Sequence, residues 1–185
     1  VTATDPNIQL PAYVFAYRTP GNKEKDAYAL DMLSTYLSNG KSSVLYKKLV
    51  DQDKKALQVQ AFNQGFEDYG IFAFFAIPMG ATTKATIQTD IDAEIKKLQT
   101  TLISQEDYQK LQNQFENQFV NQNSNIEGIA ASLATNHVLM GDTNLINKEI
   151  DIYRSISRED LQNAAKKYLN QNQRVIINYV PEKKK

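Results

Sequence analysis

The sequence predicts an α+β fold in which an antiparallel sheet carries helices packed on one face. Two stretches with strand character, residues 57–62 and 69–77, follow each other with no helix between them. Five segments with helical periodicity then come together before a final strand. A parallel sheet would need helices alternating with strands, whereas grouped strands and grouped helices are typical of an α+β domain.

The first elements are a strand and two helices. Residues 12–17 carry aromatic and β-branched side chains on both faces, which indicates a strand that is buried on both sides or packed centrally in the sheet. Residues 24–38 repeat apolar side chains at helical spacing, and Asn39-Gly40 supplies a helix stop. A short second helix is expected to begin at residues 42–43.

Two strands are expected to pair directly after these helices. In residues 57–62, Leu57, Val59 and Ala61 alternate with mostly polar side chains, which predicts a strand with one polar face. Residues 69–77 are apolar apart from one glycine. The connection between the two strands is longer than a tight hairpin and still suits antiparallel neighbours.

The rest of the chain is expected to be helical up to a closing strand at residues 174–180. Two apolar stripes at helical spacing predict helices on either side of residue 104. Serine and aspartate stand at capping-box spacing at Ser104 and Asp107 and again at Ser157 and Asp160. The other helices are expected over 125–140, which Gly141 ends, over 145–153, and from 157 to about 169.

The composition excludes several classes of partner. Lys plus Arg and Asp plus Glu both number 21, so no net field attracts nucleic acid or an anionic membrane. The chain has no cysteine, which excludes disulfides and thiolate metal sites. No apolar run reaches the roughly 20 residues of a membrane span. The absence of an initial Met or leader predicts a piece of a longer chain, and Lys183-Lys184-Lys185 an exposed end or a linker.

The residue types needed for catalysis are scarce. Catalytic zinc usually takes three protein ligands, most of them histidine, and His137 is the one histidine. It shares a helical face with Ile129 and Leu133, so we expect a packed histidine in the core or at an interface. Gly40-Lys41-Ser42 lacks the first glycine and the preceding strand of a phosphate-binding loop. No catalytic residue and no metal ligand is therefore assigned.

The acidic clusters also have ordinary explanations. Residues 90–94 hold three carboxylates at helical spacing without the glycine of a calcium loop, so a solvated helix face is expected. Residues 51–53 are expected to form a turn. With no cysteine and no Gly-x-Ser-x-Gly elbow, the chain also offers no site for nucleophilic catalysis.

Three motifs lie between Asn39 and Phe72. They are Gly40-Lys41-Ser42-Ser43-Val44-Leu45-Tyr46, the strand Ala56-Leu57-Gln58-Val59-Gln60-Ala61-Phe62, and Gly70-Ile71-Phe72. This succession resembles the second, inactive domain of an M16 (insulinase or pitrilysin-type) peptidase half, where Gly-x-Ser-Ser-Arg-Leu-Tyr, a Tyr-x-Val strand and Gly-x-Phe follow one another. The order of elements is similar over nearly the whole chain. The resemblance implies that residues 1–185 form a single non-catalytic M16-like domain excised from a longer chain.

The departures from the family pattern are informative. The inverted zinc motif His-x-x-Glu-His is missing, so the resemblance implies no enzyme activity in the isolated domain, no cofactor in it, and zinc only in a separate catalytic domain. An Arg and a Tyr of the family's substrate-binding half fall at Val50 and Leu57, and a further Arg falls at Val44. The chain therefore resembles the second domain of the zinc-bearing half, or a degenerate partner domain.

The resemblance also suggests partners and a site. The family's two halves close around a chamber that admits unfolded peptides, so the expected partners are an N-terminal zinc-bearing M16 domain or partner half, and an unfolded peptide. Gln58, Gln60 and Tyr46 are the candidate peptide-contacting residues. A Gln- and Asn-rich helix face is a second candidate wall, with ordinary solvated surface as the alternative. That face consists of Gln105, Gln112, Asn113, Asn117 and Gln118.

Three readings of the function stay open. The first is a non-catalytic domain of an M16 zinc metallopeptidase that lines the peptide chamber and packs against the zinc-bearing domain. The second is an M16-like scaffold or interaction subunit with no peptidase role. The third is an unrelated ligand-binding α+β domain, which helices on both faces of the sheet would favour. By resemblance, the expected location is the bacterial periplasm or envelope.

Overall fold

The computed structural model describes residues 1–182 and contains a five-stranded sheet with the order β1-β5-β2-β4-β3. The strands are β1 (Thr2–Asp5), β2 (Ala12–Pro20), β3 (Ala56–Gly65), β4 (Tyr69–Pro78) and β5 (Arg174–Pro181). The four predicted strands are present, and each pair of neighbours among them is antiparallel, as expected. The lysine tail at 183–185 lies outside the described residues.

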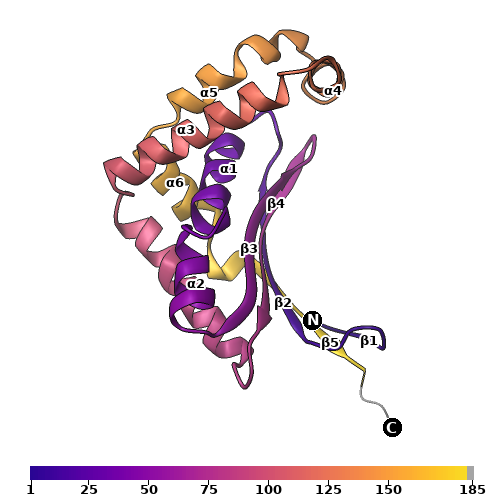
Figure 1. The fold of residues 1–185 in the computed structure, drawn as a ribbon, viewed down its shortest axis with the longest axis vertical. Coiled ribbons are helices and arrows are strands. Elements are labelled where there is room, and N and C mark those ends of the chain that lie inside the picture. Colours follow the sequence, from indigo (N-terminus) through magenta and orange to yellow (C-terminus); the bar gives the residue numbers. More distant parts are fainter. Residues whose placement is uncertain (183–185) are drawn as a thin grey trace.

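Strand β1 was not predicted from the sequence. It lies parallel to β5, with Thr2 opposite Asn178 and Asp5 opposite Pro181, so the sheet is mixed. Its Thr-Ala-Thr-Asp sequence is too short and too polar to show the alternation that predicts a strand, and none of its residues is fully buried. The pairing places both ends of the described chain at the same corner of the sheet (Figure 1).

Within residues 1–182, six α-helices and four shorter helical turns accompany the sheet. The α-helices are α1 (Lys25–Ser38), α2 (Lys84–Thr100), α3 (Gln105–Gln122), α4 (Ile126–Thr135), α5 (Glu149–Ser155) and α6 (Arg158–Tyr168). The turns are the π-helical η1 (Tyr46–Gln52) and η2 (Asn136–Met140) and the 3₁₀-helical η3 (Thr143–Asn147) and η4 (Gln171–Gln173). The helix expected over 125–140 is therefore α4 continued by η2, and the one expected over 145–153 is η3 followed by α5.

The helix ends follow the predicted signals. Gly141 ends η2 with φ of 77°, a left-handed conformation that glycine adopts without strain. Ser157 and Asp160 form the full capping box of α6. Ser104 caps α3 by accepting from the Asp107 N–H at 3.0 Å, but the Asp107 carboxylate accepts from the Ser104 hydroxyl instead of the backbone. The second capping box is therefore only half formed.

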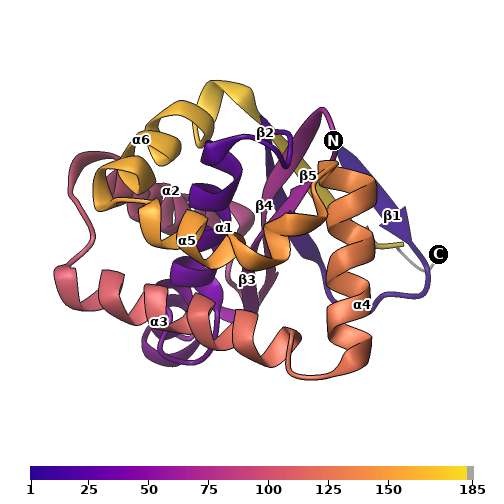
Figure 2. The same ribbon diagram turned by 90° about the horizontal axis from the view of Figure 1, so that it is seen from above.

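The helices lie on one face of the sheet and leave the other face without a helix (Figures 1 and 2). The core fills the space between the two layers. Its fully buried members from the sheet are Phe15, Tyr17, Phe72 and Phe74, and those from the helices include Leu30, Leu33, Ile87, Ile91 and Leu161. This arrangement confirms the predicted α+β class with helices on one face.

The acidic run at residues 90–94 is not the solvated helix face that was expected. The Asp92 carboxylate accepts from Arg174, whose side chain is only 5% exposed and also donates to the Tyr17 hydroxyl at 3.2 Å. Asp90 accepts from Lys55 Nζ at 2.7 Å, and the whole of Glu94 is 6% exposed. The prediction failed because helix α2 turns these side chains toward basic groups and the core, which spacing alone does not reveal.

Helix α4 is less covered than its apolar stripe suggests. It lies near one end of the sheet (Figure 1), and Ile126 is 87% exposed while Ile129 and Leu133 are 39% and 38% exposed. His137, in η2, is exposed as well. The core alternative for His137 is therefore wrong within the described chain, because the apolar face that carries it has little to pack against there. The interface alternative stays a prediction.

Candidate functional site

The candidate residues Gln58 and Gln60 lie on the edge strand β3 and point away from the helices. Side chains alternate along a strand, and Val59 and Ala61 are buried against the helical layer while both glutamines are exposed. A register shift between Ala56 and Gln58 sets this alternation. It also turns Leu57 outward, to 48% exposure, so the prediction that Leu57 shares a face with Val59 is wrong.

The two glutamines border an apolar surface that runs across the helix-free side of the sheet, which we name the open face. Its rows follow from the strand registers. They are Gln60, Phe75, Val14 and Ile177; Phe62, Ala73, Ala16 and Val175; and Gln64, Ile71 and Arg18. Apart from Arg18, every member from the central strands β2 and β4 is apolar, and the amides form a row along the β3 edge.

Several large apolar side chains of the open face contact solvent in this chain. Phe62 is 45% exposed, Ile71 40% and Val175 53%. The Arg18 guanidinium lies 5.0 Å from the centre of the Tyr69 ring at one end of the face. Contiguous apolar surface of this kind marks interaction sites in soluble proteins. The geometry therefore provides an apolar docking area with a hydrogen-bonding rim.

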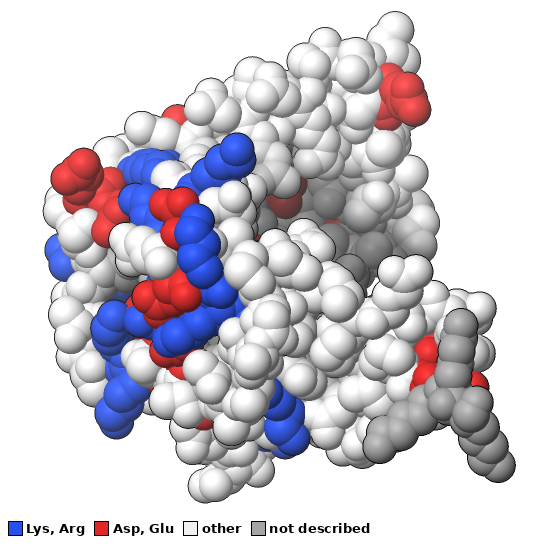
Figure 3. Space-filling model, turned by 60° about the horizontal axis from the view of Figure 1, so that its bottom comes forward, with Lys and Arg blue, Asp and Glu red and all other residues white. Residues whose placement is uncertain are grey.

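Charged side chains gather elsewhere, and they gather in mixed sign. Lys55 contacts both Asp53 at 3.1 Å and Asp90 at 2.7 Å, and Lys48 lies 3.7 Å from Asp53. Figure 3 shows basic and acidic side chains grouped together on one side of the view, with most of the remaining surface uncharged. No single sign of charge dominates the surface in this view.

The free edge of β3 is partly closed by helix α1. The Ala61 N–H donates to Ser38 Oγ at 2.7 Å, and the Ser38 hydroxyl donates to the Ala61 carbonyl at 2.9 Å. An edge strand pairs with an added strand through such groups. At Ala61 they already have partners, so a peptide contacting β3 there would meet its side chains rather than its backbone.

Tyr46, the third candidate, lies apart from the two glutamines. It begins η1, which packs on β3 within the helical layer and buries Leu49 in the core. Tyr46 is half-buried, and no hydrogen bond joins it to Gln58 or Gln60 within residues 1–182. The structure therefore brings Gln58 and Gln60 together on one face and leaves Tyr46 on another element.

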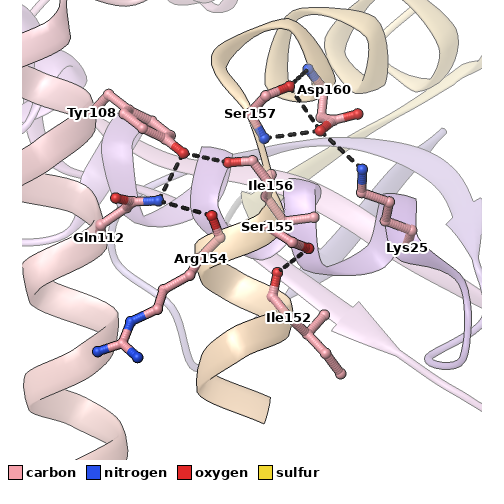
Figure 4. A network of polar contacts seen from close by, with 9 residues as sticks. All are labelled: Lys25, Tyr108, Gln112, Ile152, Arg154, Ser155, Ile156, Ser157 and Asp160. Atoms are coloured by element: carbon pink, nitrogen blue, oxygen red, sulfur yellow. Dashed lines mark hydrogen bonds and ion pairs between the residues drawn. The ribbon is translucent and has the colours of Figure 1, made fainter. Parts of the chain in front are cut away.

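The Gln- and Asn-rich face of α3 cannot form one wall with the open face, because α3 belongs to the helical layer on the other side of the sheet (Figure 1). Part of it is also engaged inside the domain. Gln112 Nε2 donates to the Tyr108 hydroxyl at 2.7 Å, and that hydroxyl donates to the Ile156 carbonyl at 2.6 Å (Figure 4). Gln112 thus tethers α3 to the α5–α6 connection.

The donor set does not fit zinc. His137 is exposed on η2, the chain has no cysteine, and residues 1–182 contain no group of three or more His, Cys, Asp or Glu side chains placed to hold a metal ion. In the same range, no helix is both long and apolar enough to cross a membrane.

The sequence of this chain matches the family model described as the Peptidase M16 inactive domain over residues 1–115. The chain therefore belongs to the M16 peptidase family and corresponds to its inactive domain. The resemblance in the stretch 39–72 is confirmed, and the match includes β3 and β4.

Individual relatives show how much of a longer protein this chain represents. It is 28% identical over 173 residues to the zinc protease PqqE of Helicobacter pylori, which covers 92% of this chain and 38% of that protein. The crystal structure of a protease from Helicobacter pylori superimposes with a TM-score of 0.89 at 25% identity, over 98% of this chain and 43% of that one. The chain thus spans less than half of each of these two proteins.

A more distant structure shares the fold alone. The periplasmic protease PqqL from Escherichia coli matches with a TM-score of 0.77 at 14% identity, over 98% of this chain and 20% of that one. The fold similarity therefore extends over nearly the whole of this chain.

Sequence reasoning found the polar rim of the open face and missed its apolar centre. Phe62 was assigned to the polar side of its strand, and Phe75 to a strand that is apolar apart from one glycine. The alternation of β3 and the all-apolar β4 were the available signals. These two signals predict a common surface only when the position of the β3 bulge, and therefore the pairing of β3 with β4, is known.

Proposed function

We propose that this chain is the non-catalytic domain of a longer M16 zinc metallopeptidase, that it packs against the zinc-bearing domain, and that it lines a chamber for unfolded peptides. The observation that carries the proposal is the open face on a chain that belongs to the inactive M16 domain. An apolar sheet face needs a covering layer, and the chain spans only 38% of the zinc protease it matches. Another domain of such a protein would supply that layer.

The open face offers two kinds of contact. Its apolar centre around Phe75 and Val14 suits packing against the companion domain. The amides of Gln58 and Gln60 provide neutral donors and acceptors for a peptide backbone. Because Ser38 occupies the β3 edge at Ala61, the peptide would run over the side chains of β3. Tyr46 would be reached by a peptide that continues past this edge toward η1.

Zinc and hydrolysis belong to the companion domain in this proposal. Hydrolytic zinc needs three protein ligands and an open position for water, and the residues of this chain do not fit that set. The domain would contribute peptide contacts and packing. We also propose a periplasmic or envelope location, which the fold similarity to a periplasmic protease supports.

A second candidate function is a scaffold or interaction subunit without peptidase activity. It is favoured by Val44, Val50 and Leu57, which stand where the family carries Arg, Arg and Tyr. The two functions differ in the rest of the protein. A companion domain with His-x-x-Glu-His supports the peptidase, and an M16-like companion without it supports the scaffold.

The test uses the full-length protein and a set of unfolded peptide substrates. Replacing both Gln58 and Gln60 with alanine is expected to raise KM several-fold and leave kcat within about twofold, because only peptide contacts are removed. Gln171→Ala, at an exposed position in η4, is the matched control and should leave both constants unchanged. Tyr46→Ala extends the test to the third candidate.

Two results would count against the proposal. An unchanged KM in the double glutamine variant would remove the β3 contact from it. The absence of hydrolysis by zinc-loaded full-length protein, with a companion domain that lacks the zinc motif, would replace the peptidase with the scaffold.

A further inference from the structure

A cavity of about 160 Å³ lies within the helical layer, between α1, η2, η3 and α5. Two carboxylates line it, Asp31 from α1 and Glu149 from α5. Its apolar walls include Leu139, Met140 and Tyr28. Leu139 is 43% exposed, so the cavity opens to solvent on that side. Figure 3 shows a hollow in the surface with acidic atoms in its depth.

The two carboxylates have no positively charged partner within residues 1–182. Asp31 accepts only from neutral groups, from Asn63 Nδ2 at 2.8 Å and the Tyr153 hydroxyl at 3.3 Å. For Glu149, no hydrogen bond or ion pair of its carboxylate is found in the same range. Carboxylates surrounded by protein normally have a cation or a strong set of donors beside them. Neither Asp31 nor Glu149 has such a cation among the described residues.

The buried position of Asp31 and Glu149 changes the pKa values of both carboxyl groups. Burial raises the pKa of Asp31 to about 6, the hydrogen bonds from Asn63 and Tyr153 oppose the rise, and the charge of Glu149 adds to it. Burial also raises the pKa of Glu149. Tyr28 and Tyr153 are the other titratable groups that face the pair, and burial raises the pKa of each. The lining residues of η2 and η3 carry no titratable group.

Asn136 is an independent indication that this cavity binds a polar group. It lines the same cavity, is 8% exposed, and its Nδ2 is buried without a hydrogen-bond partner among the described residues. Its side-chain oxygen likewise has no hydrogen bond there. A half turn about the last side-chain bond exchanges the two atoms, so the amide can present either a donor or an acceptor to the cavity.

We propose that this cavity binds one basic aliphatic side chain, that of a lysine or arginine in a peptide. An ammonium group has three donors and no acceptor, and Asp31, Glu149 and Asn136 offer acceptors from three sides of the cavity. The alkyl stem would pack along Leu139 and Met140, as long basic side chains do on apolar surface. The proposal concerns the cavity alone and stands whether or not the open face lines a peptide chamber.

The probe is the peptide Gly-Gly-Lys-Gly-Gly, titrated into the isotopically labelled 185-residue chain at pH 8 and followed by NMR. We expect saturable shifts of the Asn136 side-chain amide and of the Glu149 backbone amide. The same peptide with norleucine in place of lysine keeps the stem and lacks the charge, and it should bind at least tenfold more weakly. The arginine peptide should behave like the lysine peptide.

A variant and a change of pH make the test sharper. Glu149→Gln keeps the side-chain shape and removes one charge, so it should weaken binding of the lysine peptide about tenfold. Glu127→Gln, on the exposed part of α4, should have no effect. In the unmodified chain, the affinity should fall several-fold between pH 8 and pH 5 as Asp31 takes up a proton.

Equal binding of the lysine and norleucine peptides would overturn the proposal. An unchanged affinity in Glu149→Gln would also overturn it. If that variant fails to fold, the pH series on the unmodified chain decides, and an affinity independent of pH is then the refuting result.

The same titration on the full-length protein identifies the source of the side chain. Binding of the added lysine peptide there assigns the cavity to a bound peptide. If the cavity resonances already show the bound shifts and the added peptide changes nothing, a basic side chain from elsewhere in the protein fills it.

Discussion

At the scale of single residues, position decides what a side chain can do in this domain. The sequence placed Asp31 on a helix without distinction from other acidic residues, and the fold set it beside Glu149 in a cavity. The three glutamate and aspartate side chains at 90–94 were expected in solvent, yet Asp92 pairs with the buried Arg174. Long-range neighbours produce both outcomes, and helical spacing along one segment contains no information about them.

The raised pKa of Asp31 makes a specific prediction for stability. A carboxyl group whose pKa rises from 3.8 to about 6 on folding binds its proton more tightly in the native state than in the unfolded chain. Its contribution to the unfolding free energy is therefore fully present below pH 4 and is lost as the pH rises toward 6 and above. The loss corresponds to at most about 3 kcal/mol.

The measurement compares urea denaturation of the unmodified chain with that of Asp31→Asn between pH 4 and pH 7. Other carboxyl groups, such as Asp26 and Asp160, have lowered pKa values and opposite slopes, so the difference between the two proteins is the quantity to follow. The unmodified chain should lose stability relative to the variant as the pH rises. Asp151→Asn, at a side chain 73% exposed, is the control. A difference independent of pH would refute the assignment.

At the scale of elements, the sequence predicted what local periodicity determines. The α-helices and the strands β2 to β5 were found because apolar spacing and caps are properties of each segment. Strand β1 was missed because its four residues gain strand character only by pairing with β5. Each of them pairs with a residue 176 positions further along the chain. The outward turn of Leu57 was missed because a bulge changes the alternation without a mark in the residue types.

The Ser38 side chain of α1 forms hydrogen bonds with the backbone at the free edge of β3. Ser38→Ala removes both hydrogen bonds to the Ala61 backbone. Ala61 is only 8% exposed, so water replaces the lost partner poorly. We expect the unfolding free energy to fall by about 1–2 kcal/mol, with a few tenths restored by the higher helix propensity of alanine.

Hydrogen exchange provides the specific readout for this variant. The Ala61 amide should exchange roughly 5- to 30-fold faster in Ser38→Ala, because a loss of about 1–2 kcal/mol changes the local opening equilibrium by that factor. Ser34→Ala removes a hydroxyl that bonds within α1, to the Asp31 carbonyl, and should leave Ala61 unchanged. Unaltered exchange at Ala61 in Ser38→Ala would show that the hydroxyl does not protect this edge.

At the scale of the whole molecule, the sequence revealed the family and the layer arrangement but not the uncovered surface. An all-apolar strand such as β4 indicates burial on both faces. It cannot say which face is covered by the same domain. The open face is identified only by the strand pairing, which places Phe62, Phe75 and Val175 together on the side of the sheet without helices.

The exposed part of this face predicts how the isolated chain behaves in solution. Phe62, Ile71 and Val175 are each between 40% and 53% exposed. Their replacement by serine therefore removes apolar surface that is only about half buried within the isolated chain. We expect the triple variant to bind a hydrophobic dye less strongly and to self-associate less at high concentration. The unfolding free energy should fall by about 1 kcal/mol per site.

The surface of α4 and η2 gives the matched comparison, because Ile126 of α4 and Val138 of η2 are also exposed, at 87% and 74%. Serine at these two positions should reduce dye binding without changing association through the sheet. In a full-length protein whose companion domain covers the open face, the triple variant should instead loosen the domains, which limited proteolysis between them would detect. If the triple variant leaves both self-association of the isolated chain and protection of the full-length protein unchanged, the open face is not the surface through which this domain packs.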